Sequence, residues 1–95
     1  MKTIHKFVLP NPTDDNNPLH VTMPVGAEIL AIQPQSYHGD ICVWALVDTE
    51  AAGHIVRRIW VIGTGEPMPG VTLKFITTIQ LDGGRRVFHI FEEIY

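Results

Sequence analysis

Short runs of β-branched and aromatic residues alternate with glycine and proline along the whole sequence. Such runs fit a pleated, half-buried surface, and the Gly and Pro residues between them mark turns. No window shows the i, i+3, i+4, i+7 recurrence of apolar side chains that an amphipathic helix requires. The sequence therefore predicts an all-β protein of about seven short strands. The expected strands are Thr3–Leu9, Leu19–Met23, Glu28–Gln35, Asp40–Thr49, Ile55–Ile62, Leu73–Leu81 and Arg86–Glu93.

The length of the chain limits how these strands are arranged. A sequence of 95 residues can form one hydrophobic core, but two independent cores would each be too small to sustain folding. We therefore expect a single antiparallel domain over residues 1–95, folded as a sandwich or a small barrel. With 45% hydrophobic and 18% charged residues, the chain is too apolar for intrinsic disorder, and no stretch is long enough to span a bilayer. The net charge of −3 gives no reason to expect a nucleic-acid partner.

Turn-forming residues predict how neighbouring strands are connected. The glycines of Asp82–Arg85 can adopt the positive φ of a tight primed turn, which predicts a hairpin over Leu73–Glu93. Tyr37–Asp40 is expected to join the third strand to the fourth in a second hairpin. Pro34 cannot donate a ladder hydrogen bond, so its strand should lie at a sheet edge or end there. The polar segment Asn11–Pro18 is a candidate contact loop.

Hydrophobic patterning predicts which strands are buried. The fourth strand is apolar on both faces, so it should lie in the centre of its sheet. The sixth strand alternates in polarity, which predicts one buried face that includes Phe75. Large buried side chains contribute most to folding, so Trp44, Phe75 and Phe88 are expected core residues whose truncation to Ala should abolish folding. Apolar residues on both faces of two strands also leave open a surface that a second chain completes.

The single cysteine and the histidines do not form a recognisable reactive site. Cys42 lies in an apolar run and is expected to be a buried, inert thiol. Residues 1–7 are not followed by an apolar run, so we expect no signal peptide and a location in the cytoplasm. The five histidines lack the i, i+2 or i, i+4 spacing of a metal site. His89 is the most interior of them, and Asp48, Glu92 or Glu93 could orient it as a general base, although a structural role is favoured.

No other motif supports catalysis. Gly63–Glu66 superficially resembles a phosphate-binding glycine loop, but the P-loop lysine and the following helix are missing. Ser36 is the only serine, and it does not lie in a nucleophile elbow. We therefore expect a protein without catalytic residues, metal or cofactor.

Candidate partner contacts come from two basic pairs and several large side chains. Neighbouring strand residues point to opposite faces, so the members of each arginine pair should separate and be solvated, with the stem of one Arg of each pair lying over the edge of the core. Alternatively, Arg57 or Arg58 lies beside Arg85 or Arg86 on a neighbouring strand, and the two arginines form a patch that binds an acidic partner. Large residues near Trp60 and the C-terminus, namely Phe91, Ile94 and Tyr95, either form a homodimer patch or complete the core. The candidate contact residues are Arg57, Arg58, Trp60, Glu66, Arg85, Arg86 and Tyr95.

Five segments carry a resemblance to known sequences: Met1–Phe7, Met23–Leu30, Ile41–Asp48, Ile62–Pro67 and Val87–Glu92. Through them, almost the whole chain resembles a family of small uncharacterised proteins found in phages and prophages. No catalytic residue carries over from this family. The family's glycine loop often has His before Pro, whereas this chain has Glu66, so the loop does not require an imidazole.

The resemblance implies a small protein that acts by contact in the host cytoplasm, such as an inhibitor of a host defence system. Two alternatives are a protein that sequesters a nucleotide-like signal and a minor structural component of the virion. A sequestering protein would need a concave pocket lined by Arg and aromatic side chains.

Overall fold

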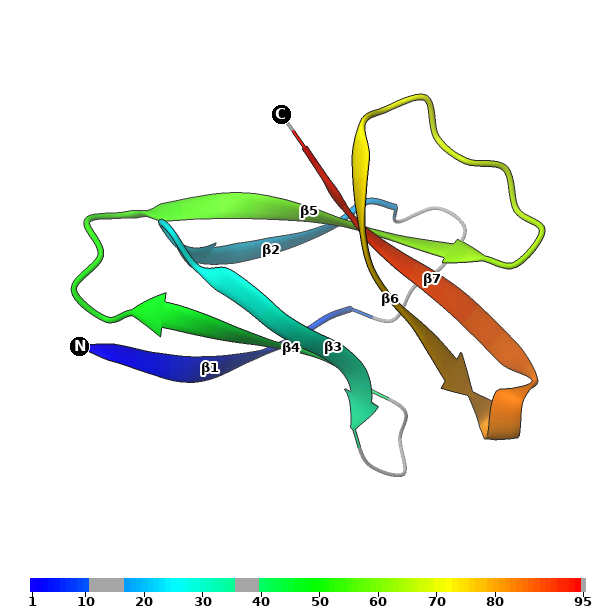
Figure 1. Ribbon diagram of the computed structural model, residues 1–95, viewed down its shortest axis with the longest axis horizontal. Coiled ribbons are helices and arrows are strands. Elements are labelled where there is room, and N and C mark those ends of the chain that lie inside the picture. Colours follow the sequence, from blue (N-terminus) through cyan, green and yellow to red (C-terminus); the bar gives the residue numbers. More distant parts are fainter. Residues whose placement is uncertain (11–16, 36–39, 95) are drawn as a thin grey trace.

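The computed structural model describes residues 1–10, 17–35 and 40–94. Its strands form two antiparallel sheets that pack as a sandwich (Figure 1). Sheet A has the order β1-β4-β3 and sheet B the order β2-β5-β7-β6. Their bounds are β1 Lys2–Val8, β2 Leu19–Pro24, β3 Glu28–Gln35, β4 Asp40–Asp48, β5 His54–Gly63, β6 Leu73–Leu81 and β7 Arg86–Glu93. The all-β prediction is confirmed, and every predicted strand end lies within one residue of the observed end.

The hydrophobic core lies between the inner faces of the two sheets. The central strand β4 contributes Val43 and its inward-pointing neighbours, and sheet B contributes Ile59 and Ile90, all fully buried. Each such side chain contributes roughly 1.5–3 kcal/mol to folding by leaving water. The predicted central position of the fourth strand is confirmed, because β1 and β3 flank it on both sides.

The opposite face of β4 carries Cys42. This thiol is only 1% exposed, which confirms that it is buried. Two side chains from the flanking strands meet above the sheet, where Lys6 Nζ on β1 donates to Gln35 Oε1 on β3 at 2.9 Å. The same Gln35 oxygen lies 3.6 Å from Cys42 Sγ. Flanking side chains therefore shield the thiol on a face that has no second sheet over it.

Both β3 and β6 are edge strands, and each contains a β-bulge. Pro34 lies in β3, so its predicted edge position is confirmed. In β6 the register shifts between Phe75 and Thr77, so Phe75 faces outward opposite Phe91 and Thr77 faces inward opposite Ile90. A bulge adds one residue to a strand and reverses its alternation beyond that point.

The predicted set of core residues is therefore partly wrong. Phe75 is 55% exposed, so the expectation that it is buried is wrong. Trp44 is half-buried on the outer face of sheet A, so it also lies outside the core. Phe88 alone of the three packs against the core, as a partly buried side chain.

The connections agree with the predicted hairpins. The β6–β7 hairpin is confirmed, and Leu81 pairs with Arg86 across the predicted connection Asp82–Arg85. It includes a 3-10 turn at Asp82–Gly84, where all three residues have positive φ. Strands β3 and β4 pair as predicted. The turn between them and most of the predicted contact loop, residues 11–16, lie outside the described residues.

Before β2 begins, the side chain of Asn17 continues the hydrogen bonding between β2 and β5. Asn17 Nδ2 donates to the carbonyl of Val61 at 2.7 Å, and its Oδ1 accepts from the Val61 amide at 3.0 Å. The amide group thereby reproduces the paired hydrogen bonds of an antiparallel ladder. Within residues 1–10, 17–35 and 40–94, no helix has the length and apolarity to cross a membrane.

Candidate binding surface

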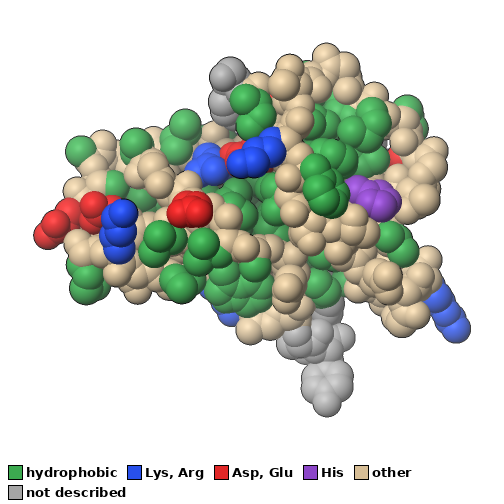
Figure 2. All heavy atoms as spheres, viewed as in Figure 1, with side chains coloured by type: hydrophobic (Ala, Val, Ile, Leu, Met, Phe, Trp, Pro, Cys, Tyr) green, Lys and Arg blue, Asp and Glu red, His purple; other side chains and the backbone are tan. Residues whose placement is uncertain are grey.

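Three aromatic side chains line up across the outer face of sheet B, which is the face turned away from the core. The register places Trp60 on β5 opposite Phe91 on β7, and Phe91 opposite Phe75 on β6. The rings of Phe75 and Phe91 meet edge to face, with centroids 5.5 Å apart and an interplanar angle of 68°. Hydrophobic side chains gather on the surface around β6 and β7 in Figure 2. We call Trp60, Phe91 and Phe75 the aromatic row.

An ion pair lies at one end of the aromatic row. Arg58 Nη1 donates to Glu93 Oε2 at 2.7 Å, and the Trp60 indole Nε1 donates to Glu93 Oε1 at 3.0 Å. These two hydrogen bonds, that from Arg58 first, lower the pKa of Glu93 below its ordinary value. Glu93 therefore stays ionised and holds the Trp60 ring in one orientation.

His89 lies on the same face and is held by two threonines. Its Nε2 lies 2.8 Å from Thr64 Oγ1, and its Nδ1 lies 3.0 Å from Thr78 Oγ1. Among the described histidines, His89 is half-buried whereas the others are exposed, as expected, but two threonine hydroxyls rather than a carboxylate orient it. The sequence pattern alone could not show that β7 turns this side chain outward, between β5 and β6, because that depends on which strands pair with β7.

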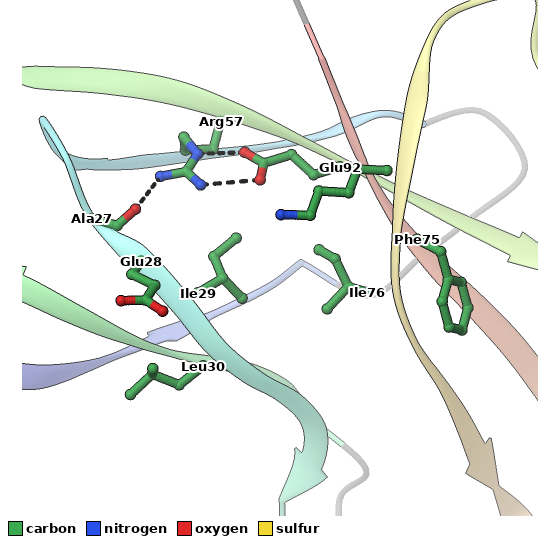
Figure 3. Close-up of a pocket in the computed structure, with 9 residues that line it drawn as sticks. Ala27, Glu28, Ile29, Leu30, Arg57, Phe75, Ile76 and Glu92 are labelled. Carbon is green, nitrogen blue, oxygen red and sulfur yellow. Dashed lines mark hydrogen bonds and ion pairs between the residues drawn. The ribbon is translucent and has the colours of Figure 1, made fainter.

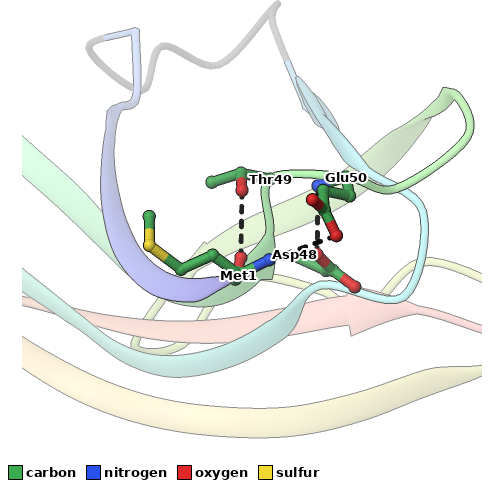
Figure 4. A network of polar contacts seen from close by, with 4 residues as sticks. All are labelled: Met1, Asp48, Thr49 and Glu50. Carbon is green, nitrogen blue, oxygen red and sulfur yellow. Dashed lines mark hydrogen bonds and ion pairs between the residues drawn. The ribbon is translucent and has the colours of Figure 1, made fainter.

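The carboxylate of Asp48 has other partners, far from His89 at the end of sheet A. Its Oδ1 accepts from the Met1 amine at 3.3 Å and from the Glu50 amide at 3.0 Å (Figure 4). The Glu50 amide, and then the Met1 amine, lower the pKa of Asp48. This group ties the beginning of β1 to the end of β4, and Thr49 Oγ1 adds a bond to the Met1 carbonyl at 3.0 Å.

The two arginines of the first pair separate to opposite faces, as predicted, but they are not simply solvated. Arg57 points inward, where Nε and Nη2 donate to Glu92 and Nη1 donates to the Ala27 carbonyl at 2.8 Å. The side chains of Arg57 and Glu92 are only 16% and 13% exposed. The prediction of a solvated Arg57 is therefore wrong, because Glu92 and the chain before β3 enclose it.

A cleft of about 420 Å³ opens between β3 and β6, beside this ion pair. Both β-bulges border it, and Ile29 and Ile76 lie on its facing sides (Figure 3). Arg57 and Glu92 close one end of the cleft, and the ring of Phe75 points away from it, on the far side of β6. Charged side chains line the cleft beside the aliphatic ones, namely Glu28, Arg57, Lys74 and Glu92, and Arg57 is already hydrogen-bonded to Glu92.

The second arginine pair lies at the other end of sheet B. Because β5 and β7 are antiparallel, Arg57 and Arg58 lie beside the end of β7, whereas Arg85 and Arg86 lie at its start. The predicted patch formed by both pairs is therefore wrong. Arg86 pairs with Asp82 at 2.7 Å and lies over a phenylalanine ring, and Arg85 is exposed beside a shallow hollow of about 440 Å³.

The remaining candidate contact residues are Glu66, Ile94 and Tyr95. Glu66 is exposed in the β5–β6 connection, where its amide donates to the Gly63 carbonyl at 3.0 Å. Its carboxylate folds back over Gly63, so closely that a Cβ at Gly63 would lie 2.7 Å from Glu66 Oε1. Ile94 is exposed, and Tyr95 lies outside the described residues.

The chain matches the family model described as domain of unknown function (DUF7352) over residues 1–95. The protein belongs to the DUF7352 family. No curated protein and no solved structure matches it.

In this DUF7352 protein the aromatic row was only partly visible in the sequence. Trp60 and Phe91 were candidates, but Phe75 was assigned to the core because strict alternation ignores a bulge. Glu93 was not predicted to be the partner of Arg58. The available signal was that two consecutive glutamates lie near the C-terminus and two consecutive arginines lie in β5. Among the described residues, no three His, Cys, Asp or Glu side chains are grouped so that they could hold a metal ion.

Proposed function

We propose that this DUF7352 protein is a non-enzymatic binding module that contacts another protein through the outer face of sheet B. The observation that supports this proposal most strongly is the aromatic row, which faces solvent across three adjacent strands. Phe75, with more than half of its surface exposed, is not needed by the core. Centres of protein interfaces are enriched in such aromatic side chains.

The polar groups beside the aromatic row also suit burial by a partner. Glu93 satisfies both Arg58 and the Trp60 indole, and two threonines hold His89. Burying a polar group costs less free energy when the group already has a hydrogen-bond partner within the protein. These contacts also fix side-chain rotamers before binding, which lowers the entropic cost of association. The face is therefore suited to a partner surface that is mainly apolar.

The sequence resemblance to small phage and prophage proteins supports a host protein as the target. A component of a host defence system, bound in the host cytoplasm, is the target class that this resemblance favours. A protein that acts by covering a surface of its target needs no catalytic group, which is consistent with a face built from aromatic side chains and internally paired charges.

Sequestration of a nucleotide-like signal is the main alternative, and the cleft between β3 and β6 has a suitable volume for it. Its chemistry is less suitable. Arg57 already donates to Glu92 and Ala27, so a phosphate would have to compete with a carboxylate. The Phe75 ring, which would have to stack on a base, points away from the cleft. Contact with a protein is therefore the function that the geometry supports better.

Affinity capture with tagged protein from infected or host cells, followed by mass spectrometry, tests this proposal. The wild type is compared with Phe75→Ser and with Val25→Ser, a control of similar exposure in the turn between β2 and β3. One stoichiometric protein that is lost with Phe75→Ser and retained with Val25→Ser would support the proposal. Capture that Phe75→Ser leaves unchanged would exclude this face.

Two further outcomes would point to the alternatives. An empty capture, together with a melting temperature that nucleotides raise, would favour sequestration. Co-purification with viral particles would favour a virion component.

A further inference from the structure

The edge strands of sheets A and B differ in how well they are protected from pairing with another chain. β3 and β6 contain bulges, and β2 is short, with Pro18 before it and Pro24 as its last residue. β1 contains no bulge and no proline, since it pairs with β4 without a register shift along its full length, and its protection is limited to Lys2 and Lys6. It lies at the lower margin of the molecule in Figure 1. A regular, exposed edge strand can form hydrogen bonds with a further strand.

Hydrogen bonds at the two ends of β1 show which backbone groups are available. The Leu9 amide donates to the Ile41 carbonyl at 2.8 Å, and the Thr49 amide donates to the Met1 carbonyl at 2.9 Å. Hydrogen-bonded and non-hydrogen-bonded pairs alternate along an antiparallel ladder, so residues 3, 5 and 7 also bond to β4. The residues between them point their N–H and C=O groups away from the sheet. These are Lys2, Ile4, Lys6 and Val8, and all four side chains are exposed.

We propose that β1 pairs antiparallel with β1 of a second copy of this chain, about a two-fold axis at His5. The pairing joins two three-stranded A sheets into one continuous sheet of six strands. An interface of this kind uses the same surface on both copies and is closed after two subunits. It leaves the outer face of sheet B exposed and does not depend on the proposed function.

The charges of β1 select one register. With the axis at His5, Lys2 faces Val8 of the second copy, and Ile4 faces Lys6. All four outward residues of each strand are then paired, and no two lysines are opposite each other. A shift by two residues in one direction places Lys2 opposite Lys6, and in the other direction places Lys6 opposite Lys6. Like charges directly opposite each other destabilise a strand pair, whereas a lysine stem can pack on an aliphatic side chain.

Sedimentation equilibrium and amide hydrogen exchange of the untagged protein over a range of concentrations test the pairing. We expect a reversible dimer in which the amides of Lys2, Ile4, Lys6 and Val8 become protected as the concentration rises. The amides of residues 3, 5 and 7 should be protected at every concentration, because they bond within the chain. A protein that stays monomeric up to millimolar concentration overturns the proposal. A dimer whose even-numbered β1 amides stay unprotected overturns it as well.

A charge swap tests the register. Val8→Lys places two pairs of like charges at the interface, and it should raise the dimer dissociation constant between about twofold and about thirtyfold. Adding Lys2→Glu to Val8→Lys should restore the dimer. Because these two positions lie at opposite ends of β1, a restored dimer would show that residue 2 of one copy interacts with residue 8 of the other. Val25→Lys, in a turn away from β1, should leave the constant unchanged.

Val8 is exposed, so its replacement should leave the fold intact, and circular dichroism checks this for each variant. Failure of Lys2→Glu to restore the dimer of a folded Val8→Lys protein overturns the register proposed here.

Discussion

The neighbouring residues Arg57 and Arg58 allow the same substitution to be compared in two environments. Arg57→Met removes the hydrogen bonds to Glu92 and to the Ala27 carbonyl and leaves Glu92 largely enclosed. Removing one partner of a buried ion pair costs about 3–5 kcal/mol. Arg58 is 44% exposed, and Glu93 keeps its bond from Trp60. An exposed ion pair of this kind contributes about 0–1 kcal/mol.

We therefore expect Arg57→Met to lower the free energy of unfolding by about 3 kcal/mol and Arg58→Met by less than about 1 kcal/mol. A loss of about 3 kcal/mol is a large part of the roughly 5–15 kcal/mol that stabilises a typical domain. Urea unfolding followed by the fluorescence of Trp44 and Trp60 measures both values. The double variant Arg57→Met with Glu92→Leu should recover most of the loss, because it replaces the pair with apolar packing. Equal losses for the two single variants would refute the reasoning.

Three further predictions test the fold and the candidate surface. Phe75→Ala should change stability by less than about 1 kcal/mol, whereas Ile90→Ala should cost about 2–5 kcal/mol, which thermal melting distinguishes. The lowered pKa of Glu93 means that its ion pair stabilises the protein above the ordinary glutamate value of 4.5, and that this stabilisation is lost as the pH falls through the folded-state pKa. Acid unfolding of Glu93→Gln should therefore show a weaker pH dependence than that of the wild type. Cys42 should react with a thiol reagent only under unfolding conditions, and rapid labelling of the native protein would contradict its burial.

Local features of the sequence were sufficient for the strand boundaries. Gly and Pro end the runs of β-branched residues, and these steric preferences act within a few residues, so they do not depend on the rest of the fold. The edge position of Pro34 followed from its missing donor, and the burial of Cys42 followed from the apolar run around it. Both predictions are confirmed.

The candidate surface was harder to predict, because it depends on which strands are neighbours. The pairing of β5 with β7 brings Trp60 to Phe91 and Arg58 to Glu93. The same antiparallel pairing separates the two arginine pairs and so excludes the alternative in which they form one patch. Nothing in the local sequence marks the bulge after Phe75, which turns that ring from the core to the surface.

The sequence by itself determined where the strands of the described residues begin and end and which of them carry apolar side chains on both faces, since the alternation of side chains is a property of each strand alone. The tertiary structure decided which strands are neighbours, where the bulges lie and which charges are enclosed. These features depend on contacts between residues far apart in the chain, such as Arg57 with Glu92. The bulge in β6 places Phe75 on the opposite face from Ile79 and Leu81, and the pairing of β5, β6 and β7 then brings Phe75 beside Phe91 and Trp60 to form the aromatic row.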